Sequence, residues 1–458
     1  AFLPLWCMRG GGPLQCLRLA THWMLASMDC APAKALVQVA ALHLQPNLHV
    51  EARLQISSCG LRRSKSATAA PRGRWLALGL AGGASIAACR ATAARRSRQV
   101  RDWEPVREGP KMRVVVFGGT GYIGHHAVQE LAERGHSVVV IARQRSGIGG
   151  KQSLADVQSL FRSDNVSVVL GDVTDFPSLK RLLLSLRPSP QAAVCCLASR
   201  TGGPTDSVEV DYQATVNCIK ACRAARCVHF VLLSAVCVQR PVLAFQRAKL
   251  QAEEELRRHP DAMSYSIVRP TAFFKSLLPQ IDAVRNGAAF RMFGDGTKVR
   301  CKPISEHDLS SFMADCLWDL ERQNRVLPVG GPGPALSFKE QGEMMFELLG
   351  SKPRFTRLPY ALFSAIQAIL DLLAQLFPTR FADLAEFGRI GRYYAEESML
   401  VLDPVTGQYS EALTPSYGQT SFRAFLATAL RGGSGSLAGQ QLGEQGLREQ
   451  LRAAAHLR

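Results

Sequence analysis

Residues 113–124 combine a predicted strand with a glycine-rich turn, and this stretch constrains the fold more than any other. Residues 113–117 are mostly β-branched and apolar, which is typical of a fully buried strand. Three glycines follow at intervals of three residues, namely Gly118, Gly121 and Gly124. An amphipathic helical pattern then covers residues 125–134, and a second buried strand is predicted at 137–141. Strand, turn, helix and strand within about thirty residues predict one βαβ unit.

The spacing of the glycines indicates a turn that binds the pyrophosphate of a dinucleotide cofactor. One glycine permits the tight turn, one lets the phosphates approach the backbone, and one lets the helix lie close to the sheet. The N-terminus of the helix then offers unpaired N–H groups to the phosphates. We expect cofactor contacts at Gly118, Thr120, Gly121, Tyr122, Ile123 and Gly124. The alternative is a purely structural turn in another kind of α/β protein.

The end of the second strand selects between the two nicotinamide cofactors. An acidic residue there would bind the ribose hydroxyl of NAD, whereas a cation accommodates the 2′-phosphate of NADP. The chain has no acid at this point and carries Arg143, Arg145 and Ser146 instead. These residues predict NADPH as the cofactor, and the alternative is that both arginines are merely solvated.

Strands and helices continue to alternate through the middle of the chain. Further strands are predicted at 166–170, 192–197, 229–238 and 265–270. This alternation predicts an α/β fold with a doubly wound parallel sheet, that is, a Rossmann domain. Asp172 and Val173 follow the third strand, where a carboxylate can bind the adenine amino group. Leu197, Ala198 and Ser199 end the fourth strand and are expected to face the cofactor ribose and nicotinamide.

Four regions are predicted along the chain. They are a largely disordered presequence (1–110), the NADPH-binding domain (111–330), a smaller, mostly helical substrate-binding region (331–431) and a flexible tail (432–458). Within the third region, residues 362–377 form a strongly apolar helix. A core helix packed on the main domain is the favoured interpretation, and binding of a hydrophobic ligand or a membrane surface is the alternative.

The basic charge of the chain is concentrated near its start. The net charge is +18, and +12 of it lies in residues 1–101, which hold 14 Lys and Arg and two acids. Such a composition is typical of organelle presequences. Residues 75–89 form an uncharged run that is short for a membrane span, so we interpret it as a signal-like part of the presequence, with a membrane anchor as the alternative.

Two classes of site are not expected. The body of the chain shows no basic patch with interleaved aromatic residues, so no nucleic-acid partner is predicted. The thirteen cysteines include neither a Cys-x-x-Cys pair nor a Cys/His cluster at metal-binding spacing, so no metal site is predicted.

The glycine fingerprint resembles the atypical branch of the short-chain dehydrogenase/reductase superfamily, and more specific stretches narrow the resemblance. They resemble one family of that branch, the plant-type divinyl chlorophyllide a 8-vinyl-reductases. The matching stretches are 120–124, 142–148, 196–200, 245–249, 266–276, 301–305 and 388–398. Together they extend over roughly residues 111–430, nearly the whole predicted folded body. The resemblance implies NADPH-dependent reduction of a vinyl group to ethyl on a chlorin substrate, in a plastid, with possible peripheral contact to plastid membranes.

The resemblance also identifies one predicted catalytic residue. Typical members of the superfamily place a Tyr four residues before a Lys, and the phenol donates a proton while the lysine lowers its pKa. Here the corresponding helix carries Phe245 and Lys249, so the lysine is present and the phenol is absent. Vinyl reduction fits this change, because the conjugated macrocycle can spread the negative charge that the hydride leaves. Lys249 is expected either to deliver a proton or to hold the nicotinamide ribose.

Two other functions remain open at this point. One is a catalytically silent NADPH-binding sensor or assembly subunit, which the missing tyrosine permits. The other is an atypical reductase that acts on a different conjugated alkene. Turnover of divinyl chlorophyllide distinguishes the three hypotheses, because a sensor would bind NADPH without oxidising it.

Overall fold

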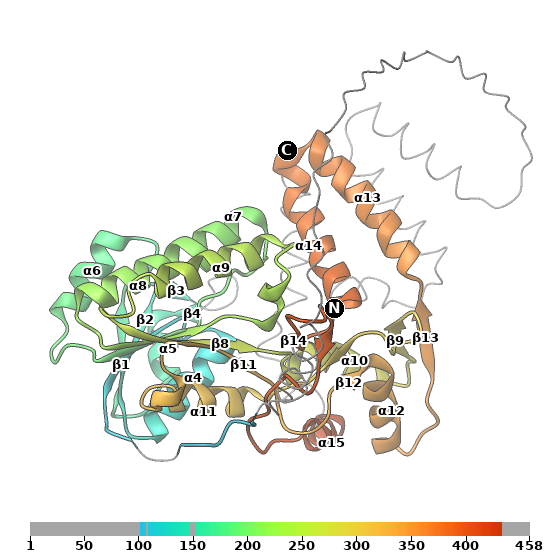
Figure 1. The fold of residues 1–458 in the computed structure, drawn as a ribbon, viewed down its shortest axis with the longest axis horizontal. Helices are drawn as coiled ribbons and strands as arrows, with labels where there is room; N and C mark the ends of the chain where they lie inside the picture. The colour runs from blue at the N-terminus through green and yellow to red at the C-terminus, as the bar shows by residue number, and fades with distance from the viewer. Residues whose placement is uncertain (1–100, 107–108, 147–151, 433–458) are drawn as a thin grey trace, which may run out of the picture. The chain divides into compact units, whose positions relative to one another are not determined.

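A seven-stranded parallel sheet forms the centre of the protein (Figure 1). The computed structural model describes residues 101–106, 109–146 and 152–432. The strand order is β11-β8-β7-β6-β1-β2-β5, and every neighbouring pair is parallel. The strands are β1 (Arg113–Phe117), β2 (Ser137–Ala142), β5 (Val166–Leu170), β6 (Ala192–Cys195), β7 (His229–Leu233), β8 (Ser264–Pro270) and β11 (Arg325–Val329). The order reverses between β1 and β6, which confirms the predicted doubly wound Rossmann fold. In such sheets, ligands bind at the carboxyl ends of the strands where the order reverses.

Helices cover both faces of this sheet, as Figure 1 shows. One face carries α4 (Tyr122–Glu133), α5 (Leu154–Leu160) and α11 (Glu306–Asp315). The other carries α6 (Phe176–Ser185), α7 (Pro204–Asp206), the π-helical segment Ser207–Ala214, α8 (Thr215–Ala224) and α9 (Ala244–Arg257). The apolar side chains form a separate buried cluster on each face, because strand residues alternate between the two. Val114 and Val116 belong to the first cluster, and Val115 and Phe117 to the second.

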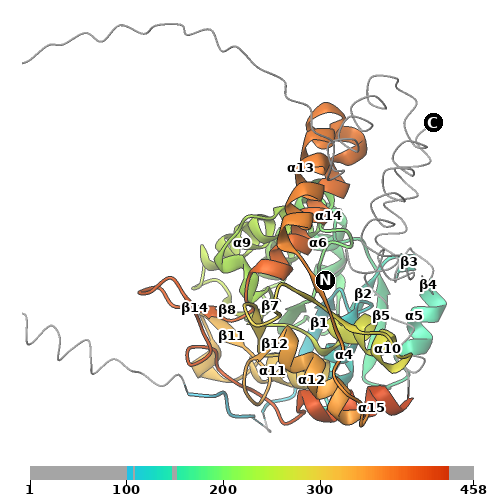
Figure 2. The same cartoon turned by 90° about the vertical axis from the view of Figure 1, so that its right-hand side faces the viewer.

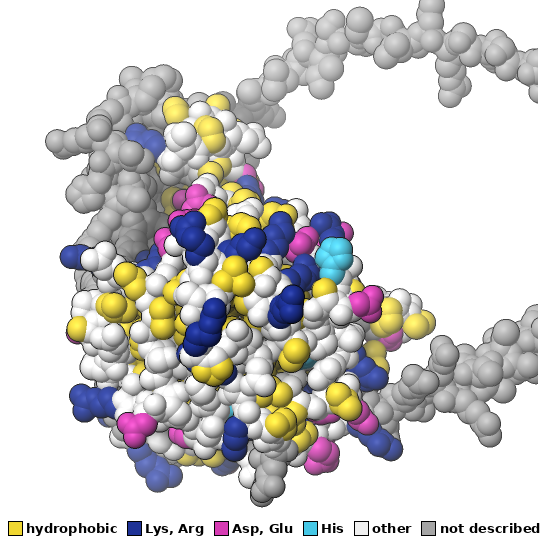
Figure 3. Space-filling view, turned by 90° about the vertical axis from the view of Figure 1, so that its left-hand side faces the viewer, with side chains coloured by type: hydrophobic (Ala, Val, Ile, Leu, Met, Phe, Trp, Pro, Cys, Tyr) yellow, Lys and Arg dark blue, Asp and Glu magenta, His cyan; other side chains and the backbone are white. Residues whose placement is uncertain are grey.

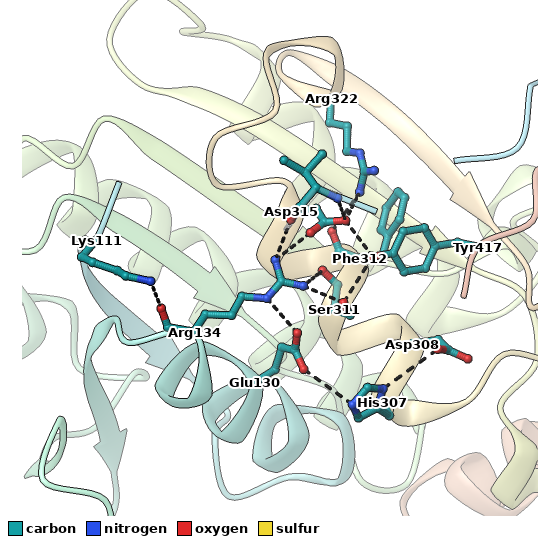
Figure 4. A network of polar contacts seen from close by, with 11 residues as sticks. Lys111, Glu130, Arg134, His307, Asp308, Ser311, Phe312, Asp315, Arg322 and Tyr417 are labelled. Atoms are coloured by element: carbon teal, nitrogen blue, oxygen red, sulfur yellow. Dashed lines mark hydrogen bonds and ion pairs between the residues drawn. The ribbon is translucent and has the colours of Figure 1, made fainter. Parts of the chain in front are cut away.

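The segment before β1 packs against the folded body, and this differs from the prediction that residues 1–110 form a disordered presequence. The Trp103 indole donates a hydrogen bond to the carbonyl of Pro328 (3.1 Å) and its ring packs edge-on against Phe312. The amide of Val106 donates to a carboxylate oxygen of Asp315 (3.1 Å). The folded body therefore begins before Lys111. Figure 4 shows the polar network around Asp315 that receives this segment.

A smaller, mostly helical region adjoins the carboxyl side of the sheet. It contains α10 (Leu278–Arg285), α12 (Phe338–Leu348), α15 (Phe422–Gly432) and a parallel pair of strands, β9 (Phe290–Phe293) and β13 (Phe355–Leu358). Their apolar side chains share one buried cluster, which includes Phe274, Phe290 and Phe346. The residues of this cluster come from segments before and after β11 in the sequence. The region is therefore not a separate domain that follows the Rossmann domain along the chain.

Three short antiparallel pairs complete the strands of the described chain. They are β3 (Arg145–Ser146) with β4 (Gln152–Ser153), β10 (Arg300–Cys301) with β12 (Leu336–Ser337), and β14 (Val401–Leu402) with β15 (Tyr409–Ser410). Helix α12 begins directly after β12 because Ser337 and Glu340 form a reciprocal capping box.

Two long helices form a hairpin that projects from the sheet in both Figure 1 and Figure 2, namely α13 (Tyr360–Leu376) and α14 (Pro378–Glu396). Helix α13 buries Phe363, Leu370 and Leu373. Its other face remains exposed, with Leu372 at 47% and Leu376 at 58% of their full accessible surface. The favoured prediction of a core helix packed on the main domain is therefore wrong, because its main partner is α14.

One face of the molecule carries several Lys and Arg side chains beside hydrophobic and uncharged ones (Figure 3). None of the helices in the described ranges has the length and apolar character needed to span a bilayer. The segment 75–89 and the tail 433–458 lie outside the described residues.

Candidate active site

The glycine turn after β1 has the close packing that the sequence predicts. Gly118 adopts φ +75°, a conformation that favours glycine, and its carbonyl accepts a hydrogen bond from the amide of Gly121 (2.9 Å). A Cβ on Gly124 would lie 2.1 Å from the Gly118 carbonyl oxygen, so any larger residue would push α4 away from the turn. This geometry brings the N-terminus of α4 directly onto the end of β1.

The N-terminus of α4 has no side-chain cap. Its N-cap residue, Gly121, provides no side-chain cap, and the first turn contains no acid. The Lys275 ammonium lies 4.2 Å from the ring centroid of Tyr122, and among the described residues it has no hydrogen-bond partner. Burial lowers the pKa of Lys275 to about 8, although the nearby Glu306 opposes the shift. A cation beside an uncapped helix N-terminus can bind a phosphate. Sequence reasoning did not assign this role to Lys275.

The residues expected to select the cofactor lie immediately after β2. Arg143 and Arg145 are both exposed. Arg145 and Ser146 form β3, which pairs with β4 and thereby fixes the backbone direction beyond the sheet edge. Their contact with a 2′-phosphate remains a prediction.

The other predicted cofactor positions follow β5 and β6. Asp172 uses one carboxylate oxygen locally, where it accepts hydrogen bonds from the amide (2.9 Å) and hydroxyl (2.7 Å) of Thr174. The carbonyl of Val173 accepts from the Asn217 amide (3.0 Å). Leu197, Ala198 and Ser199 follow β6. All these positions lie at the carboxyl ends of four adjacent strands, β5, β2, β1 and β6, and therefore along one edge of the sheet.

Lys249 forms a buried ion pair that sequence reasoning missed. Its ammonium lies 3.0 Å from Oδ1 of Asp211 and donates to the Leu197 carbonyl (3.3 Å). The Asp211 side chain is only 1% exposed and that of Lys249 is 13% exposed. Burial lowers the pKa of Lys249, but attraction from Asp211 and the thiols of Cys195 and Cys237 outweighs burial and raises it. Lys249 is therefore a permanent cation at the end of β6.

Asp211 is presented by an unusual stretch of backbone. It lies within the π-helical segment Ser207–Ala214, which precedes α8 without a break. Single π-helical turns occur frequently at functional sites. The segment also carries Glu209, so the sequence did not single out Asp211, and its spatial partner could not be read from spacing alone.

Comparisons with known proteins identify the family. A model of the NAD(P)H-binding type matches residues 118–319. The chain is 54% identical over 336 residues to the divinyl chlorophyllide a 8-vinyl-reductase, chloroplastic, of Zea mays, covering 72% of this chain and 82% of the relative. The protein of the same name from Arabidopsis thaliana is 47% identical over 343 residues, covering 74% and 81%. The chain belongs to the divinyl chlorophyllide a 8-vinyl-reductase family.

Solved structures support the fold of this family member. A UDP-glucuronic acid 4-epimerase mutant from Bacillus cereus aligns with a TM-score of 0.50 at 16% identity, covering 70% of this chain and 98% of that one. A UDP-glucose 4-epimerase from Thermotoga maritima also aligns with a TM-score of 0.50 at 16% identity, covering 71% and 100%. At this identity the likeness concerns the Rossmann-like fold alone.

In this family member, α14 closes the site on the side of β6 and α9. Oε1 of Glu386 accepts a hydrogen bond from the Ala244 amide at the start of α9 (2.6 Å). A Cβ on Gly203, in the loop after β6, would lie 2.4 Å from Oδ1 of Asp383. Phe245, at the position of the missing tyrosine, packs against an apolar cluster that includes Ile390. The approach of α14 to this site was not predicted, because its contacts join segments that are distant along the chain.

Proposed function

We propose that this chain reduces the 8-vinyl group of divinyl chlorophyllide a to ethyl, with NADPH as the hydride donor, in chlorophyll biosynthesis. The observation that carries the proposal is the 54% identity to the maize protein of that name over 336 residues. The open glycine turn and the buried Lys249–Asp211 pair supply a site that fits the cofactor. Divinyl protochlorophyllide is a second candidate substrate with the same vinyl group.

Each part of the site has a role in this reaction. When bound, NADPH supplies a hydride to the outer carbon of the vinyl group. The glycine turn binds the pyrophosphate through backbone N–H groups of α4, and Lys249 holds the nicotinamide ribose at the end of β6. Phe245 excludes water beside the reacting group and cannot donate a proton. The conjugated macrocycle spreads the negative charge until its inner vinyl carbon is protonated.

Incubation of the full chain with divinyl chlorophyllide a and NADPH, followed by pigment chromatography, tests the proposal. We expect a monovinyl product with one NADPH oxidised for each vinyl group reduced. Divinyl protochlorophyllide in a parallel reaction establishes the preferred substrate. NADPH binding without oxidation would instead favour the sensor or assembly role.

Replacement of Arg143 by alanine tests the choice of NADPH. A charge-assisted contact to the 2′-phosphate contributes roughly 1.5–3 kcal/mol, so the Michaelis constant for NADPH should rise about tenfold or more. The constant for NADH should change little, since NADH lacks that phosphate. Steady-state kinetics with both cofactors measure the difference, and a wild-type protein that uses NADH equally well would refute the assignment.

The N-terminal residues are proposed to direct import into plastids. Trp103 and Val106 bind the folded body, which supports a start of this body before residue 103. A protein that lacks residues 1–99 should remain active but should not enter isolated chloroplasts. Removal of residues 1–110 should lower the free energy of unfolding by about 3 kcal/mol, since it deletes the partly buried Trp103. Equal stability of the two truncated proteins in urea would contradict this boundary.

The exposed face of α13 is proposed to contact the plastid membrane peripherally. Leu372, Leu376 and Phe377 are exposed there on a helix that projects from the body. Replacing Leu372 and Leu376 together by glutamate should reduce co-sedimentation with plastid-lipid vesicles several-fold, because a charged face cannot insert between headgroups. Val405→Glu is the matched control, since Val405 is 90% exposed outside the hairpin. Equal co-sedimentation of the wild type, the double glutamate variant and Val405→Glu would exclude this face as the membrane contact.

A further inference from the structure

The reaction needs a proton donor, and the usual one is absent from α9. Phe245 occupies the position of the superfamily tyrosine, and its ring packs against the apolar cluster of Val236, Leu243 and Ile390. Lys249 is a poor substitute, because Asp211 holds its ammonium in a buried ion pair. A different hydroxyl group must therefore be sought near the same cluster.

Tyr394 brings a phenol to this cluster from another helix. It lies near the end of α14 and, like Phe245, packs against this cluster. Its hydroxyl lies 4.0 Å from the Cys237 thiol, which belongs to the segment that follows β7. The contact between Tyr394 and Cys237 thus connects α14 to the segment after β7.

The neighbouring tyrosine has a different role. The Tyr393 hydroxyl donates a 3.0 Å hydrogen bond to the Cys237 carbonyl, so its proton is engaged in holding α14 to the segment after β7. Tyr394 has only the long contact to a thiol, which is a weak hydrogen-bonding group. The proton of Tyr394 is therefore the more available of the two.

We propose that Tyr394 is the catalytic acid that replaces the tyrosine missing at position 245. The proposal rests on the proposed vinyl reduction and specifies its proton-transfer step. After the hydride has formed the new C–H bond at the outer vinyl carbon, the electron pair of the double bond resides on the inner carbon and the macrocycle. That pair forms a C–H bond with the Tyr394 proton, the O–H bond breaks, and water reprotonates the phenolate.

The environment of Tyr394 suits a carbon base. Burial, followed by the proximity of Cys237, raises the pKa of the Tyr394 phenol, so it retains its proton across the physiological range. A carbanion is basic enough to remove a proton from such a weak acid.

Three variants of the full chain test the proposal: Tyr394→Phe, Tyr393→Phe and the double variant Phe245→Tyr/Tyr394→Phe. Tyr394→Phe should lower kcat roughly 10²-fold, with NADPH affinity by fluorescence titration unchanged. Tyr393→Phe loses only a structural hydrogen bond and should stay within a few-fold of wild type. The kcat of the double variant should be at least about tenfold higher than that of Tyr394→Phe, because a phenol returns to the superfamily position.

The outcomes separate this proposal from the proposed function. Wild-type protein that fails to reduce divinyl chlorophyllide a would remove the proposed function itself. If wild type is active, a Tyr394→Phe protein with normal kcat would overturn the assignment of Tyr394. Thermal melting identifies any variant that is merely unstable. Rescue of Tyr394→Phe by Phe245→Tyr would support the assignment even then, because Phe245→Tyr restores no contact at residue 394. Loss without rescue, together with weakened NADPH binding, would assign Tyr394 a structural role and overturn the proposal.

Discussion

Replacing Lys249 by alanine should lower the rate of vinyl reduction on the order of 10²–10⁴-fold, the range found when groups that act in proton transfer or cofactor positioning are lost. The substitution removes the ammonium that donates to the Leu197 carbonyl at the end of β6. It also leaves the Asp211 carboxylate, 1% exposed, without its cation. An unpaired buried charge destabilises a protein by about 3–5 kcal/mol, so stability must be measured with activity.

The double variant Lys249→Ala/Asp211→Asn is the matched control for that loss. Removing both charges should restore most of the unfolding free energy, measured in urea, because no uncompensated charge stays buried. Turnover should remain low, since the cation that positions the cofactor is still missing. Recovery of turnover together with stability would show that Lys249 serves the fold alone.

NADPH affinity then distinguishes the two roles that the sequence left open for Lys249. Weakened binding with slow turnover supports positioning of the ribose, whereas unchanged binding with slow turnover supports proton transfer. We expect the first result, because Asp211 and the Leu197 carbonyl hold the Lys249 ammonium in place.

The raised pKa of Lys249 has a consequence for stability. A lysine with a raised folded-state pKa contributes stability that is fully present below its unfolded pKa and is lost as the pH rises through the folded one. The contribution of Lys249 to the free energy of unfolding should therefore not change near neutral pH.

The sequence predicted the glycine turn and its flanking strands because their signals are local. Apolar runs, glycine spacing and helical periodicity each act within a few residues, and β1, α4 and β2 lie close to their predicted bounds. The Lys249–Asp211 pair was not predictable, since it joins two separate helices that only the folded sheet brings together. The contact of Tyr394 with Cys237 is more remote still, spanning 157 residues.

The hairpin α13–α14 shows a different reason for a failed prediction. An apolar helix that packs on a sheet and one that packs on a single neighbouring helix can have the same composition. Gln367 is buried on α13 and its amide donates to the Ala385 carbonyl of α14 (3.1 Å). Only this spatial partner shows which face of α13 is covered and which face remains exposed.

Replacing Asp315 by alanine should lower the free energy of unfolding by about 3–5 kcal/mol, because it leaves a buried cation without its carboxylate. The Asp315 carboxylate is fully buried at the end of α11, and Figure 4 shows its partners. It accepts hydrogen bonds from Arg134 at the end of α4 (2.6 Å), from Arg322 (3.2 Å) and from the Tyr417 hydroxyl (2.7 Å). The Arg322 side chain is itself 1% exposed, so its cation would remain buried with less compensation.

Urea unfolding of Asp315→Ala and of a surface control measures this effect. Glu343→Ala removes an exposed ion pair with Lys339 (3.6 Å), which should contribute at most about 1 kcal/mol. A loss of similar size in both variants would show that the Asp315 network contributes no more than a surface pair.

The Asp315 network also binds the segment before β1. Its contribution to the free energy of unfolding can therefore be tested in a second way. The Val106 amide donates to Asp315, and Arg322 donates to the Glu104 carbonyl. Deleting residues 1–110 should therefore cost less in an Asp315→Ala background than in wild type, because part of what the segment stabilises is already lost. Additive losses would mean that Trp103, rather than the polar network, anchors the segment.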